Sequence, residues 1–414
     1  MANQSVAIVG AGIFGVTAAI ALHRRGYTVS LFDPGPLPHP LAASTDISKS
    51  IGADYGSDED YTALAERALE GWLQWNAVWP EPLFHETGAA YVCQSPMAPG
   101  GFEYESYQML LSRGHAVERL NATEIHRRFP AWNADLYVDG YFNAASGYGE
   151  SGKAVAHLIA EAQSAGVKLF TGHKFTRLHE AGSRVAGIVN NENEVFPADW
   201  VVVAAGSWTP HALPFMAEYL RSVGQPVFHL KPVDPRLYQP DFFPMFGADL
   251  VKTGYYGFPV NRAGVIKIAH HGVGRQLHPE SPERVVTPQD VAELREFLHG
   301  TFPGLADVPI VYTRLCLYCD TYDEHFWIAR DPQREGLVVA SGDSGHGFKF
   351  APLLGDIIAD ALEGAPNPIL RKFRWRPELQ PVRGEEALRR IGDQARHRPS
   401  PTEPIMDRSR GVND

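Results

Sequence analysis

The start of the chain has the plainest pattern of apolar and polar positions. An apolar run at 6–9 enters the stretch Gly10-Ala11-Gly12-Ile13-Phe14-Gly15. An Ala-rich segment follows over 13–25 and closes at Gly26, and a second apolar run covers 27–32. This order is typical of a strand, a tight glycine turn, a helix and a parallel second strand.

The same two patterns return later in the chain. Apolar residues at helical spacing predict helices over 61–79, 107–113, 122–129, 153–165, 291–299 and 351–362. Short apolar runs predict strands at 89–93, 137–148, 167–170, 185–189, 195–197, 200–206 and 336–341. The runs at 200–206 and 336–341 are continuously apolar, as in strands buried inside a parallel sheet.

Strand-and-helix pieces therefore occur at the start, in the middle and near the end, while 225–328 alternates like a mixed or antiparallel sheet. This order predicts an α/β (mixed α+β) fold, with a Rossmann-type nucleotide-binding domain interleaved with a substrate domain on a large mixed sheet. The first domain is expected to combine 1–45, 146–215 and 330–365, and the second 46–145 and 216–329.

The end of the chain has a different composition. After 365 the sequence is rich in Pro, Arg and Glu. We therefore expect 366–414 to be an extension that is partly disordered, with 383–414 as a poorly ordered tail.

Bulk properties narrow the class of protein. The chain has 414 residues, 44% of them apolar, and a formal net charge of −11. Such a negative charge argues against a nucleic-acid or anionic-membrane partner. No run has the length of a membrane span and no signal peptide is recognisable, so we expect a cytoplasmic protein, a monomer or a small homo-oligomer.

The cysteines predict neither a disulfide framework nor a metal site. There are three, Cys93, Cys316 and Cys319, which suits a reducing compartment. Cys316 and Cys319 form a C-x-x-C, but they lie in the run 311–328, which is expected to be a strand. Zinc would need two further ligands, and a redox pair would normally open a helix.

The glycine turn has the chemistry of a dinucleotide site. Gly10 permits the turn, Gly12 lets a pyrophosphate approach the backbone, and Gly15 lets the helix pack on the strand. The helix N-terminus then offers N–H groups to the phosphates. Asp33 follows the second strand, about twenty residues after the glycines, where an acid binds a ribose diol and disfavours a 2′-phosphate. These residues leave NAD or FAD as the ligand.

Two later motifs bring a family into view. Ala204-Ala205-Gly206-Ser207-Trp208 and Ser344-Gly345-His346-Gly347-Phe348-Lys349, with the interleaved layout, resemble the D-amino-acid-oxidase-like flavoproteins. The branch most similar is that of monomeric sarcosine oxidase, L-pipecolate oxidase and the fructosyl-amino-acid oxidases, over roughly 6–363. The resemblance implies an FAD enzyme that oxidises the C–N bond of a small secondary amine to an imine and reduces O2 to hydrogen peroxide. A dehydrogenase with another electron acceptor and a non-catalytic flavin-binding protein remain alternatives.

The resemblance also implies where the flavin lies. Its expected contacts are Gly10, Gly12, Ile13, Phe14, Gly15, Asp33, Ser44, Thr45, Asp46, Lys49, Ala205, Gly206, Trp208, Cys316, Gly345, His346, Gly347, Phe348 and Lys349. Cys316, in a C-x-Y element before Asp323-Glu324-His325-Phe326, matches the family cysteine bonded to the flavin 8-methyl carbon. Cys319 has no family counterpart, and we expect it to be structural.

Catalytic roles follow from the same resemblance. Lys267 stands at the family spacing from Tyr256 and matches the lysine that activates O2 by stabilising negative charge. His270 and His271 should point to opposite sides of a strand, with His271 in the site. Tyr256 and Tyr318 are expected beside it, and Lys349 matches the lysine that binds the substrate carboxylate.

One position departs from the family. Small-amino-acid oxidases of this branch have an arginine where this chain has Gly52, so one donor to the substrate carboxylate is absent. Loss of the arginine is also expected to open room, in a pocket lined by Tyr55, Tyr255, Tyr256, Tyr318 and Phe348. We therefore expect a substrate bulkier than sarcosine.

Overall fold

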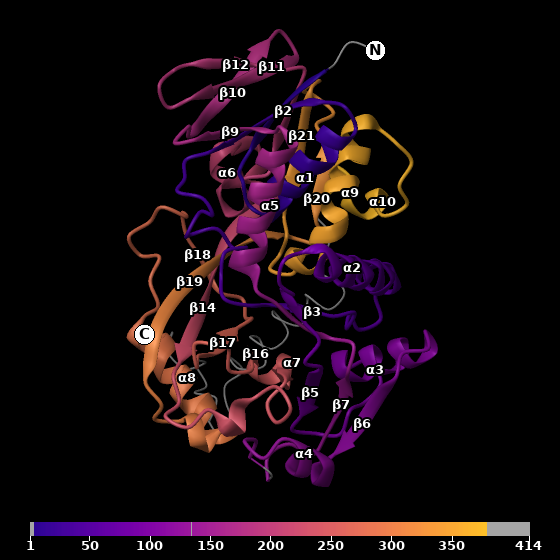
Figure 1. Ribbon diagram of the computed structural model, residues 1–414, viewed down its shortest axis with the longest axis vertical. Coiled ribbons are helices and arrows are strands. Elements are labelled where there is room, and N and C mark those ends of the chain that lie inside the picture. The colour runs from indigo at the N-terminus through magenta and orange to yellow at the C-terminus, as the bar shows by residue number, and fades with distance from the viewer. Residues whose placement is uncertain (1–3, 134, 379–414) are drawn as a thin grey trace, which may run out of the picture.

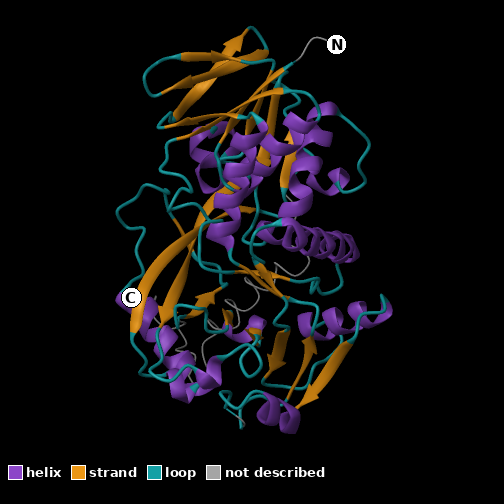
Figure 2. Cartoon of the chain, viewed as in Figure 1, coloured by secondary structure: helices purple, strands orange, loops and turns teal. Residues whose placement is uncertain are grey.

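Two large β-sheets, one above the other along the long axis, organise the chain (Figure 1). The computed structural model describes residues 4–133 and 135–378. Helices gather around the upper sheet and at the lower end of the molecule (Figure 2). The mixed α/β architecture with a Rossmann-type unit confirms the predicted fold class.

The upper sheet has six strands in the order β20-β21-β13-β1-β2-β9. Their bounds are β1 Ser5–Val9, β2 Thr28–Asp33, β9 Lys168–Thr171, β13 Trp200–Val203, β20 Trp327–Arg330 and β21 Leu337–Ser341. Neighbours run parallel, except that β20 is antiparallel to β21. Because β13 and β21 are covered on both faces, their sequences are continuously apolar, as predicted.

Alternate residues of these strands face two different layers. Val202 belongs to the core shared with α1 (Ile13–Arg24), α5 (Ser151–Ala165) and α9 (Ala351–Glu363). Val201 and Val203 instead pack toward a three-stranded sheet of β10 (Phe175–Ala181), β11 (Arg184–Asn190) and β12 (Val195–Pro197). The strand period of two thus divides one apolar run between two cores. Nearby lie the short α6 (Thr209–Ala212), η1 (Gly206–Trp208) and η2 (Pro214–Met216).

The lower sheet has the order β18-β14-β17-β16-β15-β5-β7-β6, and β19 also pairs with β14. Their bounds are β5 Ala89–Cys93, β6 Val117–Asn121, β7 Asp139–Asn143, β14 Leu220–Leu230, β15 Met245–Ala248, β16 Tyr255–Phe258, β17 Ile266–His270, β18 Arg275–Gln276 and β19 Ile310–Thr321. The pairing is antiparallel except between β5 and β15, so the sheet is mixed, as predicted. Helices α4 (Ala122–Arg128) and α8 (Pro288–Thr301) share a core with it.

The long ribbon of β14 and β19 reaches from the lower sheet toward the upper one (Figure 1). Between the sheets lie α2 (Glu59–Val78) and the small sheet of β3 (Lys49–Ile51), β8 (Gly147–Gly149) and β4 (Phe84–His85). The remaining elements are α3 (Phe102–Ser112), α7 (Leu250–Thr253), η3 (Arg236–Tyr238), η4 (Pro303–Leu305), η5 (Gly347–Phe350) and α10 (Leu370–Phe373).

Nearly every predicted element forms within a few residues of its expected bounds, but the strands β6 and β10 and the short elements β3, β4, α6, α7 and α10 were not predicted. β6 and β10 are mostly exposed: β10 has no fully buried residue, and Arg177 and Glu180 are among its exposed ones. A strand with so little buried surface has a weak hydrophobic signal in the sequence.

The glycine turn has the geometry that the sequence predicts. Gly10 has φ +99°, and a Cβ there would lie 2.6 Å from the Ala204 carbonyl oxygen. A Cβ on Gly15 would lie 1.8 Å from the Gly10 oxygen, so only glycine lets α1 approach the strand this closely. A Cβ on Gly12 would meet only Ser44 Oγ, at 3.5 Å.

The first part of the expected extension, residues 366–378, packs against the rest of the protein. Residues 366–378 include α10, whose Phe373 is fully buried, and the side chain of Arg376 is buried as well. Residues 379–414, including the predicted tail 383–414, lie outside the described residues. Among the described helices, none combines the length and apolar character needed to cross a membrane.

Candidate active site

A cavity of about 420 Å³ lies at the junction of the two sheets, with Gly10 of the turn and Tyr318 of β19 both on its wall. Of the predicted cofactor residues, those that line it are Gly10, Gly12, Ile13, Phe14, Asp33, Ser44, Lys49, Ala205, Gly206, Trp208, Gly345 and Phe348. Those that do not are Gly15, Thr45, Asp46, Cys316, His346, Gly347 and Lys349. Of the catalytic candidates, Tyr318 lines it, and Lys267, His271 and Tyr256 lie outside its wall.

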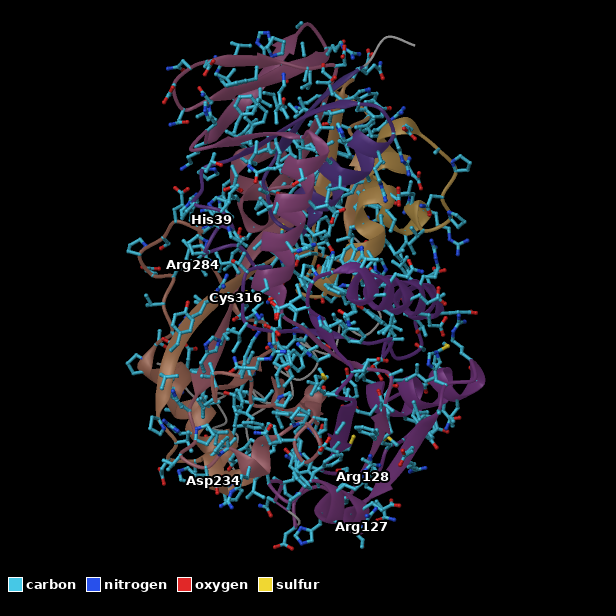
Figure 3. The ribbon with its side chains drawn as sticks, viewed as in Figure 1. His39, Arg127, Arg128, Asp234, Arg284 and Cys316 are labelled. Atoms are coloured by element: carbon cyan, nitrogen blue, oxygen red, sulfur yellow. The ribbon has the colours of Figure 1, made fainter. Side chains whose placement is uncertain are left out.

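Sequence reasoning missed one end of this cavity. It is lined by His211 of α6 and by His39, Lys174, His278 and Glu280 from loops, and none of them belongs to a motif. Lys174 and Glu280 form an ion pair at 2.7 Å. Arg284 connects two other segments at this end of the cavity. It donates to the carbonyl oxygens of Leu41 and Leu315, the latter next to Cys316, which Figure 3 labels close to Arg284.

Asp33 ends β2 and supports the turn. One of its carboxylate oxygens accepts from the Ala11 N–H at 2.9 Å, and the other from the Gly35 N–H at 2.8 Å. Gly12, the N-cap of α1, has no side chain to cap the helix, and the Ile13 N–H donates to Ser44 Oγ at 3.3 Å. The helix N-terminus lies on the cavity wall, because Gly12, Ile13 and Phe14 line it. A helix N-terminus beside a buried acid is the arrangement that binds a pyrophosphate and a ribose.

A buried charge cluster lies behind Lys49. The Lys267 ammonium is fully buried on β17, 2.7 Å from Asp46 Oδ2 and 2.5 Å from the Ser48 carbonyl oxygen, to which it donates. His229 Nε2 lies 3.3 Å from the other oxygen of Asp46. Arg314, also buried, donates to the Thr45 carbonyl.

This cluster contains more cations than carboxylates, and this imbalance shifts the pKa values of Asp46 and Lys267. Burial alone raises the pKa of Asp46, but Lys267, His229, Lys49 and Arg314 outweigh it and hold that pKa well below its ordinary value. Burial lowers the pKa of Lys267 to about 8, with Asp46 opposing and Lys49 reinforcing the shift. The cluster therefore has an excess of positive charge.

Cys316 faces the same cluster. Its sulfur lies 3.9 Å from the Lys49 ammonium, and it packs with Tyr318 and Ala43, which line the cavity. Burial lowers the pKa of Lys49, but Cys316, Asp46 and Tyr256 outweigh this and raise it above its ordinary value. Figure 3 labels Cys316 near the middle of the long axis.

Cys319 points to the other face of β19. It belongs to a core of the upper sheet and accepts from Ser341 Oγ at 3.3 Å, and burial raises the pKa of its thiol to about 12. Residues three apart on a strand lie on opposite faces, so the C-x-x-C pair is not a redox or metal pair.

Three aromatic side chains lie together at the cavity wall, where Tyr318 lines the cavity and Tyr256 and His271 lie behind it. The Tyr256 and Tyr318 hydroxyl groups are 3.4 Å apart. The His271 ring lies 5.8 Å from the Tyr318 ring and 6.3 Å from the Tyr256 ring. His270 packs instead against Tyr255, at 4.8 Å, so the histidine pair points to opposite sides, as expected from the strand.

Lys349 lies in η5, just before α9. Its ammonium lies 4.4 Å from the centre of the Tyr55 ring, and the Trp72 indole donates to its carbonyl oxygen at 2.8 Å. Within the part of the chain that the structure describes, no carboxylate pairs with this ammonium, which makes it available to an anionic group of a ligand.

The expectation that Gly52 opens room is wrong. A Cβ at this position would lie 2.4 Å from Ser146 Oγ and 2.8 Å from Asp54 Oδ2. The space is filled by the buried Asp54 carboxylate, which accepts from Tyr141 and Ser146, both at 2.9 Å. No pattern in the sequence marked Asp54 for this place.

Tyr255 does not line the site, contrary to expectation. It stacks on Phe297 of α8 at 4.2 Å, in the core of the lower sheet. Adjacent residues of β16 point to opposite faces, and Tyr256 takes the side of Tyr318.

The upper sheet is mostly parallel and carries the glycine turn, and the cavity beside it reaches a buried cationic cluster. Together these features define a dinucleotide-dependent oxidoreductase. The chain matches the family described as FAD dependent oxidoreductase over residues 5–361. It belongs to that family.

Two curated relatives cover most of the chain. It is 31% identical to N-methyl-L-tryptophan oxidase of Salmonella arizonae, over 89% of this chain and 97% of that protein. It is 28% identical to monomeric sarcosine oxidase of Bacillus sp., over 87% of this chain and 92% of that protein. Among solved structures, the fructosamine oxidase Amadoriase II of Aspergillus fumigatus superposes with a TM-score of 0.79 at 27% identity, covering 91% of this chain and 90% of that one.

The residues present fit FAD. Gly12 has no side chain over the turn, the N-terminus of α1 lies on the cavity wall, and Asp33 is buried beside both. Lys49 extends the cavity wall to the cationic cluster, where positive charge suits a ring that gains electrons.

The charge cluster yields a stability prediction. Asp46→Asn leaves buried cations without their counter-charge and should lower the free energy of unfolding by about 3–5 kcal/mol at pH 7. Because the folded pKa of Asp46 lies well below its unfolded value of about 3.9, the contribution of the carboxylate is fully present above about pH 4, declines below it, and is lost as the pH falls through the folded pKa. Urea unfolding at pH 7 and at a series of values below about pH 4 measures both effects.

Two variants control this experiment. Asp46→Asn/Lys267→Met should recover part of the loss, since one unpaired charge is removed with its partner. Asp234→Asn, which breaks an exposed pair with Arg236, should change nothing measurable. An Asp46→Asn protein as stable as the parent would contradict the assignment.

Proposed function

We propose that this protein is an FAD-dependent amine oxidase that converts the C–N bond of a secondary amine, in an N-substituted or cyclic amino acid, to an imine and reduces O2 to H2O2. The observation that carries the proposal is the buried cationic cluster of Lys267, Lys49 and Arg314 beside the aromatic group of Tyr256, Tyr318 and His271. The names of the relatives, oxidases of sarcosine, N-methyl-L-tryptophan and fructosamine, support it.

FAD, when bound, supplies the acceptor of the two electrons that leave the amine and passes them to O2. The chain supplies binding and charge. Lys349 holds the substrate carboxylate, and the Tyr55 ring beneath its ammonium fixes it in place. Tyr256, Tyr318 and His271 orient the amine between their rings.

Lys267 serves the oxygen half of the reaction. Its ammonium is held by Asp46 and the Ser48 carbonyl, so its charge is in place before O2 arrives. A fixed cation stabilises the negative charge that O2 gains with its first electron. This favours an oxidase over a dehydrogenase that uses another electron acceptor.

We further propose that Cys316 holds FAD covalently through its sulfur. The thiol shares a face of β19 with Tyr318 on the cavity wall, and its sulfur lies 3.9 Å from the Lys49 ammonium. The three buried thiols also support a cytoplasmic location.

The substrate class is tested by anaerobic flavin reduction. We expect N-methyl-L-tryptophan, pipecolate or a fructosyl amino acid to reduce the flavin with higher kcat/KM than sarcosine. A small substrate depends most on its carboxylate, and a missing charge-assisted contact at Gly52 costs about 1.5–3 kcal/mol. Reduction by none of these amines would refute the function, and sarcosine as the best substrate would refute the preference for bulk.

The covalent bond is tested by acid precipitation. The parent should give a yellow pellet, and Cys316→Ser a colourless pellet with flavin in the supernatant, because the sulfur that forms the bond is gone. Cys319→Ser, on the other face of the strand, should still give a yellow pellet. Free flavin from the parent protein would contradict the proposal.

The role of Lys267 is tested by separating the two half-reactions in stopped flow. Lys267→Met should leave flavin reduction by the amine within about tenfold but slow reoxidation by O2 on the order of 10²-fold, because charge stabilisation is lost. Lys252→Met, at an exposed lysine, is the control. Unchanged reoxidation in Lys267→Met would show that another group activates O2.

A further inference from the structure

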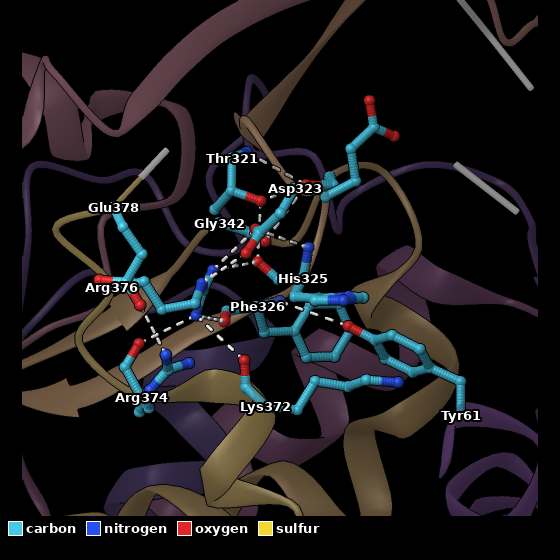
Figure 4. Close-up of polar contacts among 12 residues, drawn as sticks. Tyr61, Thr321, Asp323, His325, Phe326, Gly342, Lys372, Arg374, Arg376 and Glu378 are labelled. Atoms are coloured by element: carbon cyan, nitrogen blue, oxygen red, sulfur yellow. Dashed lines mark hydrogen bonds and ion pairs between the residues drawn. The ribbon is translucent and has the colours of Figure 1, made fainter. Parts of the chain in front are cut away.

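The last described segment, residues 370–378, lies across the loop that follows β19, and we call it the C-terminal strap (Figure 4). It follows the end of the family match at residue 361. Three of its side chains reach other parts of the molecule: Arg371 pairs with Asp60, Lys372 with Asp58, and Arg376 with Asp323.

Arg376 is the central contact. Its guanidinium is buried, with Nε 2.6 Å from one oxygen of Asp323 and Nη2 donating to the other at 2.9 Å. It also donates to the carbonyls of His325, at 3.2 Å, and Phe326, at 3.1 Å. Figure 4 shows these bonds converging on one side chain. One guanidinium thus fixes both the start and the end of the segment 323–326.

Between these anchors the backbone is strained. Glu324 has φ +60°, a left-handed conformation that a long L side chain rarely adopts. Such a residue persists only where its surroundings determine its conformation. The bonds of Arg376 to the neighbouring residues supply that constraint.

The strained residue, Glu324, contacts His346 of the motif at 344–349. The Glu324 carbonyl lies 3.2 Å from His346 Nε2, and a carbonyl only accepts, so Nε2 carries the hydrogen. In a neutral imidazole, Nδ1 then accepts from the Tyr55 hydroxyl, 3.0 Å away. Tyr55 is the ring over which the Lys349 ammonium lies.

A second series of contacts leads from the C-terminal strap to the ring of Tyr55. Lys372 lies 4.8 Å from the centre of the Tyr61 ring, and the Tyr61 hydroxyl accepts from the Phe326 N–H at 3.3 Å. Tyr61 stacks on Tyr55 with ring centres 5.1 Å apart and an interplanar angle of 15°. Both routes therefore fix the position and tilt of Tyr55.

We propose that Arg376 is a positioning residue for substrate binding: through Glu324, His346 and Tyr55 it sets the place of the Lys349 ammonium and hence the affinity for the substrate carboxylate. This inference rests on the proposed carboxylate-binding role of Lys349. It assigns a function to a segment beyond the family match.

The test compares Arg376→Ala with Arg374→Ala, whose exposed side chain pairs with Glu378. In the holoenzyme, Arg376→Ala should raise KM about tenfold for the amino acid that reduces the flavin best, with kcat within about twofold. KM for the matching secondary amine without a carboxylate should not change, which a general loss of structure would not produce. Arg374→Ala should behave as the parent.

A second measurement does not depend on activity. A Glu-specific protease should cut after Glu324 in Arg376→Ala, identified by fragment mass, and leave this bond intact in the parent and Arg374→Ala, where the residue is buried. Arg376→Lys keeps a charge toward Asp323 but loses the forked donors, so its KM should lie between the two. If Arg376→Ala does not fold, Arg376→Lys takes its place in both measurements.

The outcomes separate the inference from the proposed function. If no amine reduces the flavin, the proposed function fails, while protease cleavage still decides whether Arg376 holds the loop. If the flavin is reduced but KM is unchanged in both Arg376 variants, or rises equally for the amine without a carboxylate, the positioning role is overturned.

Discussion

The ion pair of Asp46 and Lys267 joins the loop of the upper sheet to the lower sheet, and much of the site depends on it. Burying two charges costs several kcal/mol each, so the pair persists only because the cluster supplies further partners. Arg314 and the Ser48 carbonyl are two of these. Since Ser44 and Lys49 lie on either side of Asp46 and both line the cavity, the pair also sets the shape of the cavity wall.

The chemistry of this cluster follows from its charge count. One carboxylate faces several cations, and an excess of positive charge in a buried place of low dielectric constant is costly until an anion arrives. A reaction that brings electrons to this place relieves that cost. The excess positive charge, which is unfavourable in the resting protein, thus stabilises negative charge that develops beside it.

Local patterns predicted the fold well and the site in part. The glycine turn and the apolar runs at β13 and β21 report on neighbours along the chain, and each formed as predicted. The mostly exposed strands β6 and β10 had only a weak apolar signal. The partnership of Asp46 and Lys267 joins distant segments, and Asp54 filling the space beside Gly52 depends on packing that no spacing encodes. The resemblance supplied candidates for these positions, but not their partners.

The ribbon of β14 and β19 has a consequence for how such a chain can change over time. Cys316 and Tyr318 share one face of β19, while Leu317 and Cys319 share the other. Inserting or deleting one residue upstream within this strand would exchange the two faces and turn the thiol toward the core of the upper sheet. The strand is therefore sensitive to changes of length, whereas the exposed turn between β11 and β12, residues 191–194, can accept them. Variation in length among descendants of this chain should accumulate in that turn and spare the ribbon.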